Sequence, residues 1–286
     1  MEKAQDRIEV LGRIEEYEKL GLFDRDVEND PPTRPLMPGE VDYTGKKLST
    51  KIGTFFANIA ARNYFDKKIA EGELIIKHIK GIENYFAVAK EGVVITCNHF
   101  NAYDNYAVYK AIQPYLGNRN LYKIIREGNY TSFPGFYGYL FRHCNTLPLS
   151  TNHNVLRELM NAVDKLLKRG EKILIYPEQG MWWNYRKPRP LKAGAFRFAA
   201  KSCAPVLPFF ITMEDSEKTG ADGFPIQEYT VHILPAIFPD PKLTVRENTK
   251  IMCEKNYYLW KEVYETTYGE ALSYTTEGKE VEPCSM

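Results

Sequence analysis

The stretch VVITCNHFNAYD, residues 93–104, decides the predicted fold. Its first five residues carry no charge and are mostly β-branched, which is typical of a buried strand. The strand ends in Asn98 and His99, and a helix is predicted from Asp104 to about Ile112. A strand that delivers polar side chains to its carboxyl end and then enters a helix is typical of α/β proteins, which place reactive groups at this edge of the sheet.

The alternation of strands and helices continues on both sides of this stretch. Further strands are predicted at residues 73–79, 172–176, 206–212 and 229–234, and further helices at 154–169, 194–202 and 245–268. This order predicts an α/β fold with a mostly parallel sheet covered by helices on both faces. Ile8, Leu11 and Ile14 recur at helical spacing before Gly21, so we expect a helical extension at the N-terminus.

Proline and glycine mark the boundary between this extension and the main domain. Residues 30–47 contain DPP, RP and MPGE, a density that blocks both helix and strand pairing. We therefore divide the chain into an N-terminal helix with a proline-rich lead-in at 1–48, a main domain at 49–268 and a loose C-terminal tail at 269–286.

Composition excludes several classes of protein. The 286 residues are 44% hydrophobic and 26% charged, which excludes a disordered chain, and the net charge of +1 argues against nucleic acid as a partner. A membrane-spanning helix needs about 20 apolar residues, whereas the longest runs without Lys, Arg, Asp or Glu have 14. Five widely spaced cysteines and an N-terminus without an apolar core indicate a reducing, cytoplasmic setting.

Two apolar regions each allow two interpretations. Residues 128–156 carry Arg142 as their single formal charge, and they form either a buried loop region or an apolar surface that meets acyl chains or a bilayer. Residues 52–65 place three phenylalanines on one helical stripe. That stripe packs on the core of the domain or lies on a membrane interface.

His99 and Asp104 are the candidate catalytic residues. A carboxylate one loop away can orient the histidine ring and determine its tautomer, which leaves the other ring nitrogen as a base near neutral pH. The alternative is a histidine that caps the next helix or satisfies a buried carbonyl. The sequence has no HExxH motif and no clustered His and Cys set, so no metal site is expected.

A second candidate region follows the strand at 172–176. The segment YPEQGMWWNYRKPRPLK, residues 176–192, contains four basic residues among its last seven. Such a cluster beside a strand end suits a phosphate or another anion, although a solvated loop has the same composition. Trp182 and Trp183 are expected to line a pocket or to pack the loop down.

Together these features resemble the glycerolipid acyltransferase family, which contains the 1-acylglycerol-3-phosphate acyltransferases. The N-H-x-x-x-x-D block of that family corresponds to Asn98, His99 and Asp104. The other blocks follow in order as GIENY at 81–85, YPEQGMW at 176–182, LKAGAF at 191–196 and APVLPF at 204–209. The resemblance covers residues 75–213, and it identifies 49–268 as an acyltransferase domain.

The sequence departs from the family at two positions that should hold the phosphate of the acceptor. Met181 stands where the third block of the family has an arginine, and Ser150 stands where the second block has one. The basic cluster offers Arg186, Arg189 and Lys192 as replacements; otherwise the acceptor lacks a phosphate.

The resemblance implies acyl transfer from acyl-CoA or acyl carrier protein to a hydroxyl of a lysophospholipid-like acceptor in phospholipid biosynthesis. His99 would act as the general base, Asp104 would orient it, and Asn98, Glu178 and Gly180 would contact the acceptor. No cofactor would be bound, and the protein would be peripheral on the cytoplasmic face of a membrane.

Two other functions stay open at this point. One is an ester or thioester hydrolase, because His and Asp also serve a serine nucleophile, although the sequence has no GxSxG motif. The other is a non-catalytic protein that binds lipid or a membrane surface.

Overall fold

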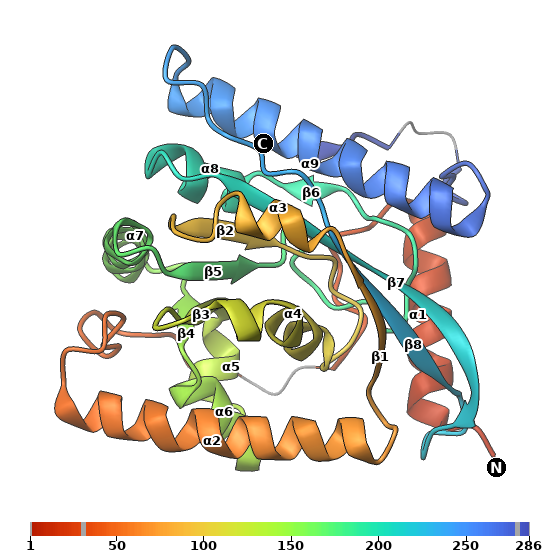
Figure 1. Cartoon of the computed structure of the whole chain (residues 1–286). Helices are drawn as coiled ribbons and strands as arrows, with labels where there is room; N and C mark the ends of the chain where they lie inside the picture. The colour runs from red at the N-terminus through yellow and green to blue at the C-terminus, as the bar shows by residue number, and fades with distance from the viewer. Residues whose placement is uncertain (1, 30–32, 278–280, 286) are drawn as a thin grey trace.

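A seven-stranded sheet forms the centre of the computed structural model, which describes residues 2–29, 33–277 and 281–285 (Figure 1). The strands lie in the order β1-β8-β7-β2-β5-β3-β4. Their bounds are β1 Ile75–Lys80, β2 Val93–Thr96, β3 Leu121–Arg126, β4 Thr146–Leu149, β5 Lys172–Ile175, β7 Val206–Thr219 and β8 Pro225–Ile233. Neighbours in this sheet run parallel, apart from the antiparallel pair β7 and β8. The predicted mostly parallel sheet is confirmed.

Helices cover both faces of the sheet. Their bounds are α1 Gln5–Leu20, α2 Leu48–Ala70, α3 Ile82–Phe86, α4 Asp104–Ile112, α5 Glu127–Thr131, α6 Gly135–His143, α7 His153–Lys168, α8 Gly194–Lys201 and α9 Val245–Tyr268. Val94 of β2 packs into the core formed with α7, α8 and α9, whereas its neighbours Val93 and Ile95 pack with α2, α3, α4 and α6. Because successive side chains of a strand point to opposite faces, an uncharged strand such as β2 is buried on both.

Helix ends follow the local sequence signals. The Asn152 side chain accepts hydrogen bonds from the backbone N–H groups of Asn154 and Val155 at the start of α7. Thr244 and Glu247 form a capping box at the start of α9, and Gly269 ends that helix with a positive φ of 70°. The N-caps satisfy backbone N–H groups at the helix starts, and the Gly269 N–H donates to the Glu265 carbonyl at the end of α9. The predicted bounds of α7 and α9 therefore agree closely with the structure.

The region at 128–156 is not the buried loop that was one of its two predicted interpretations. It contains most of α5, all of α6, the edge strand β4 and the start of α7, so much of it is regular secondary structure. Pro134 is the N-cap of α6. The backbone N–H at this position makes no hydrogen bond within the helix, so a proline, which has no N–H, is tolerated there. A Cβ atom at Gly138 would lie 1.9 Å from the Phe133 carbonyl oxygen, so glycine allows the helix to approach this turn closely. Proline and glycine here shape a short helix and do not prevent one.

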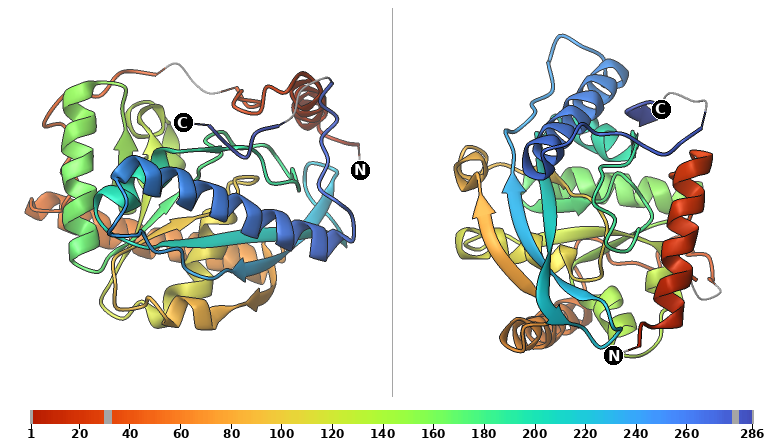
Figure 2. Two further views of the ribbon diagram at one scale, coloured as in Figure 1. Left: turned by 90° about the horizontal axis from the view of Figure 1, so that it is seen from above. Right: turned by 90° about the vertical axis from the view of Figure 1, so that its right-hand side faces the viewer.

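The N-terminal helix α1 packs against the loop that follows β5. Val10 and Ile14 of α1 form a small core with Val27, Trp182 and Trp183, and all five side chains are buried. Figure 2 shows α1 on the same side of the molecule as the C-terminal tail. The tryptophans therefore pack the loop down, which was one of their two predicted roles.

The described part of the C-terminal tail is docked, contrary to the expectation of a loose segment. Strand β9, Cys284–Ser285, pairs with β6, Leu191–Lys192. A disulfide joins Cys253 of α9 to Cys284, and the hydroxyl of Tyr274 donates to the Pro188 carbonyl. The disulfide also corrects the sequence-based picture of cysteines kept reduced. Residues 278–280 and 286 of the predicted tail lie outside the described residues.

Across the described residues, each helix is too short or too polar to cross a bilayer.

Candidate active site

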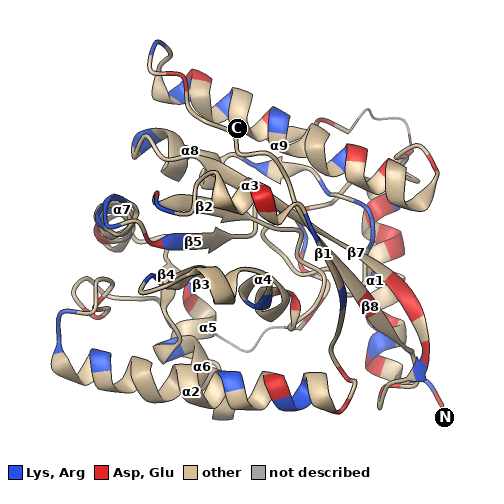
Figure 3. Ribbon diagram, in the orientation of Figure 1, with Lys and Arg blue, Asp and Glu red and all other residues tan. Residues whose placement is uncertain are grey.

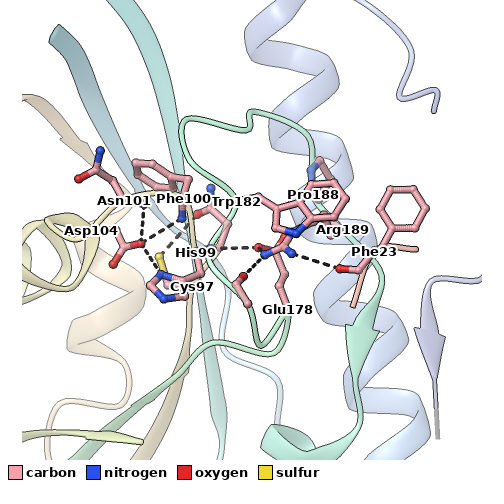
Figure 4. Close-up of polar contacts among 12 residues, drawn as sticks. Phe23, Cys97, His99, Phe100, Asn101, Asp104, Glu178, Trp182, Pro188 and Arg189 are labelled. Carbon is pink, nitrogen blue, oxygen red and sulfur yellow. Dashed lines mark hydrogen bonds and ion pairs between the residues drawn. The ribbon is translucent and has the colours of Figure 1, made fainter. Parts of the chain in front are cut away.

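His99 and Asp104 meet at the carboxyl edge of the sheet, as the sequence predicts (Figure 4). The Nδ1 atom of His99 lies 2.7 Å from Oδ2 of Asp104. Asp104 is the first residue of α4 and is completely buried, whereas the His99 side chain is 23% exposed. A neutral His99 that donates from Nδ1 to this carboxylate has Nε2 as its free, basic nitrogen.

Asp104 is held by four donors. Its Oδ2 atom also accepts hydrogen bonds from the backbone N–H groups of Phe100, at 3.1 Å, and Asn101, at 3.2 Å. Its Oδ1 atom accepts one from the Tyr176 hydroxyl at 2.6 Å. Four donors on one buried carboxylate hold it in a single orientation, so its direction toward His99 does not depend on substrate.

Tyr176, which follows β5, contacts both His99 and Asp104. Its ring stacks on the His99 ring with centroids 4.0 Å apart, and its hydroxyl binds Asp104. Burial, together with the nearby Asp104 charge, raises the pKa of Tyr176 well above its usual value, so the hydroxyl stays a donor. Tyr176 was not predicted as a site residue, although it begins the YPEQ segment that follows β5.

The Glu178 side chain is buried behind the loop that carries His99 and is not exposed at the surface of the site. Its Oε2 atom accepts the backbone N–H of His99 at 3.0 Å, and its Oε1 atom accepts the backbone N–H of Arg189 at 2.8 Å. The Arg189 guanidinium pairs with the same carboxylate at 3.1 Å and donates to the carbonyls of Gly180 and Phe23. Both side chains are almost fully buried. Glu178 and Arg189 were predicted to contact the acceptor. In the structure they are buried and hold the loop that carries His99 in place.

Asn98 is likewise a support. Its side chain donates to the Ile211 carbonyl at 3.0 Å and accepts the Ile211 N–H at 2.8 Å. These bonds join the end of β2 to β7, and the side chain is buried. Asn98 therefore orients the strand end that carries His99, and it does not face the predicted acceptor.

A broad groove of about 2200 Å³ opens beside His99. Segments that form its walls include α2, α5, α6 and the carboxyl end of β3. Apolar and aromatic side chains line much of it, among them Phe55, Tyr130, Leu140, Phe141, Leu149 and Phe198. A groove of this size and character can hold an acyl chain next to the basic nitrogen of His99.

The basic cluster does not act as one unit. Arg186 pairs with Asp215 at 2.6 Å and does not line the groove. Lys192 does line the groove, and its Nζ atom lies 3.3 Å from Oδ2 of Asp24. Of the three basic residues proposed as replacements for the missing arginines, the structure therefore places Lys192 alone on the groove wall.

Another basic residue on the groove wall was missed by the sequence analysis. Arg126 ends β3, and its guanidinium binds the carboxylate of Asp26 with two hydrogen bonds. No strand was predicted at this position, so nothing in the local sequence placed Arg126 at the carboxyl edge of the sheet.

Cys97, which precedes Asn98 and His99, is poorly suited to act as a nucleophile. Cys97 is fully buried, and burial together with the Asp104 charge raises the pKa of its thiol well above the usual value, which disfavours a thiolate nucleophile. Within the described residues, no three His, Cys, Asp or Glu side chains come together as a metal site.

A match to a protein-family model agrees with the geometry of the site. Residues 77–212 match the family model described as "Acyltransferase". This part of the chain is an acyltransferase domain. One similar solved structure is the crystal structure of the 1-acyl-sn-glycerophosphate (LPA) acyltransferase PlsC from Thermotoga maritima. It has 18% identity and a TM-score of 0.49, and the alignment covers 79% of this chain and 90% of that chain. Comparison with curated proteins finds no match.

The acyltransferase domain includes the whole His99 site. The matched range contains β2, α4 and β5, and with them His99, Asp104, Tyr176 and Glu178. For residues 77–212, the family model confirms the predicted family and the predicted enzyme class, an acyltransferase.

Proposed function

We propose that the protein transfers a fatty acyl group from an acyl thioester to a hydroxyl of a lysophospholipid-like acceptor, as a step of phospholipid biosynthesis. The donor would be acyl-CoA or acyl carrier protein. The observation that carries this proposal is the oriented pair of His99 and Asp104, with Nδ1 and Oδ2 2.7 Å apart, beside an apolar groove in an acyltransferase domain.

The reaction needs one base and no covalent enzyme intermediate. Nε2 of His99 takes the proton of the acceptor hydroxyl as its oxygen forms a bond to the thioester carbonyl carbon. The buried Asp104 carboxylate stabilises the imidazolium that results. The tetrahedral intermediate then releases the thiolate, which receives the proton from His99. The products are the acylated acceptor and the free thiol of the donor.

Acyl transfer by variants of the pair tests this proposal. We expect His99→Ala and Asp104→Asn to lower kcat by about 10²- to 10⁴-fold, because general base catalysis has this magnitude. His78→Ala is a matched control, since His78 has a carboxylate at the same spacing, Glu83, but is exposed on β1. Near wild-type transfer by a folded His99→Ala protein would refute the assignment.

The dependence of thioester consumption on the acceptor distinguishes an acyltransferase from a hydrolase. An acyltransferase consumes the thioester in proportion to the added acceptor alcohol, whereas a hydrolase consumes it without one. Thiol release that is equally fast with and without acceptor would favour the hydrolase.

We also propose that α2 lies on a membrane surface and brings the groove to its lipid substrate. Phe55 and Phe56 are 62% and 59% exposed, and Leu48 and Ile52 are exposed beside them. Residues 52–61 carry no charge, and Figure 3 shows this stretch of α2 without Lys, Arg, Asp or Glu. Because α2 borders the groove, insertion of these side chains would place the groove at the lipid surface.

Binding to vesicles tests the role of α2. We expect the double variant Phe55→Asp and Phe56→Asp to lose most binding to phospholipid vesicles, because two charged groups would enter the apolar part of the interface. Phe238→Asp is the control, since Phe238 is similarly exposed outside α2. Equal sedimentation of both variants with vesicles would contradict the proposal.

A further inference from the structure

Two cations on the groove wall are paired with carboxylates from one N-terminal segment. Nη1 and Nη2 of Arg126 lie 2.7 Å and 2.6 Å from the two carboxylate oxygens of Asp26. Nζ of Lys192 lies 3.3 Å from Oδ2 of Asp24. Arg126, Asp26 and Lys192 line the same groove as His99.

Arg126 lies over the turn that follows the catalytic-site strand β5. A Cβ atom on Gly180 would be 2.9 Å from Oδ1 of Asp26 and 3.5 Å from Nη2 of Arg126. The ion pair therefore covers the turn between Glu178 and Met181. Met181 is apolar and supplies no charge there. Arg189 also reaches this turn, but it is buried and paired with Glu178. The solvent-exposed positive charge beside the turn is therefore that of Arg126 from β3.

The N-terminal segment is held in place by contacts other than these ion pairs. The ring of Phe23 stacks on Trp182 at 5.8 Å, and the Trp182 Nε1 atom donates to the Arg25 carbonyl at 2.9 Å. Val27 is completely buried and its carbonyl accepts from Arg13. An anchored segment thus presents Asp26 to the groove and Asp24 to Lys192 on the groove wall, and loss of either carboxylate should leave the fold intact.

We propose that Arg126, with Lys192 beside it, binds the phosphate of the acceptor, and that Asp26 is an internal carboxylate that the phosphate displaces. This inference rests on the proposed acyl transfer to a lysophospholipid. The guanidinium already makes the two parallel bonds by which arginine binds a phosphate.

The exchange is physically easy. The side chains of Arg126 and Asp26 are 41% and 46% exposed, and ion pairs of such exposure are weak. A phosphate monoester accepts the same pair of hydrogen bonds and carries more negative charge than a carboxylate. Acceptors with a phosphate therefore compete with Asp26, whereas acceptors without one gain nothing from Arg126.

Kinetics with two acceptors tests the inference. Acyl transfer is measured with 1-acylglycerol 3-phosphate and with monoacylglycerol, and the acceptor and the donor are varied separately. We expect Arg126→Gln to raise the KM for the phosphate-bearing acceptor about 10- to 100-fold and to leave that for monoacylglycerol unchanged. We expect Asp26→Asn to lower the KM for the phosphate-bearing acceptor about two- to fivefold, because it removes a carboxylate that competes with the phosphate.

The chain offers a matched control pair. Arg186 and Asp215 have the same 2.6 Å separation and similar exposure but lie outside the groove, so Arg186→Gln and Asp215→Asn should leave every KM unchanged. Inorganic phosphate should inhibit the Asp26→Asn enzyme more strongly than the wild type.

Three outcomes would overturn the inference. They are an unchanged acceptor KM in Arg126→Gln, an equal effect on both acceptors, and a change confined to the KM of the donor, which would assign Arg126 to the phosphates of CoA. Failure of the wild type to acylate either acceptor would instead refute the proposed function.

Discussion

At the scale of single residues, the geometry of the site depends on the four hydrogen bonds that the Asp104 carboxylate accepts. Its carboxylate accepts hydrogen bonds from the His99 ring, two backbone N–H groups and the Tyr176 hydroxyl, so it is held in one orientation and directed at one ring nitrogen. Glu178 holds the backbone of His99 in place, because its carboxylate accepts the His99 N–H and pairs with Arg189. The position of the base is therefore determined by side chains that do not contact the substrate.

Tyr176 allows this support to be tested without removing the base. We expect Tyr176→Phe to lower kcat about three- to tenfold, because Asp104 loses one donor while the ring stack on His99 is retained. The KM for the acceptor should change little. Tyr115→Phe, which changes an exposed tyrosine, is the control. Unchanged kcat in a Tyr176→Phe enzyme with altered thermal stability would assign Tyr176 a purely structural role.

At the scale of elements, the β7 and β8 hairpin shows where apolar patterns mislead. The predicted strand at 206–212 covers the buried half of β7, whereas the structure continues it to Thr219. The outer half, MEDSEKT, is mostly exposed, so pairing with β8 holds it in the sheet without an apolar run. Strand length here is determined by the partner strand.

The same hairpin contains a partly buried histidine, His232, that makes stability depend on pH. Burial, with a contribution from Lys80, lowers the pKa of His232 to about 4, and its ring lies 3.0 Å from the Thr212 hydroxyl. The unfolded chain binds a proton near pH 6.5, so stability from the neutral histidine is present above that pH and is lost as the pH falls toward 4.

We expect the unfolding free energy of the wild type to fall by up to about 3 kcal/mol more than that of His232→Gln between pH 6.5 and 4. Chemical denaturation at a series of pH values measures this difference. Parallel pH profiles for the two proteins would contradict it. His78→Gln is the control, because His78 is exposed on β1.

At the scale of the whole molecule, the two ends of the chain pack beside the same loop. The Glu18 carboxylate of α1 accepts the backbone N–H of Thr275 and pairs with Lys187. Strand β9 then pairs with β6, and the disulfide joins the tail to α9. The segments around the His99 loop are thus braced by both termini.

The disulfide predicts a redox-dependent stability. Cys253 and Cys284 are separated by 31 residues, and closing a loop of this length stabilises a fold by about 2–4 kcal/mol. We expect Cys284→Ser to lose this amount under oxidising conditions and nothing under reducing conditions. Cys203→Ser is the control, because Cys203 is free and exposed. Equal unfolding free energies for the wild type and Cys284→Ser in oxidising buffer would exclude a stabilising bond.

The sequence by itself determined the α/β class, most strands and helices, and the pair of His99 and Asp104. These features are local: apolar periodicity reports burial within one element, and five residues of one loop bring the pair together. Tertiary structure alone decided which distant groups meet. Tyr176 reaches Asp104 across 72 positions, and Arg126 reaches Asp26 across 100. Such contacts depend on strand order and on the path of the N-terminal segment, and no local pattern encodes either of these.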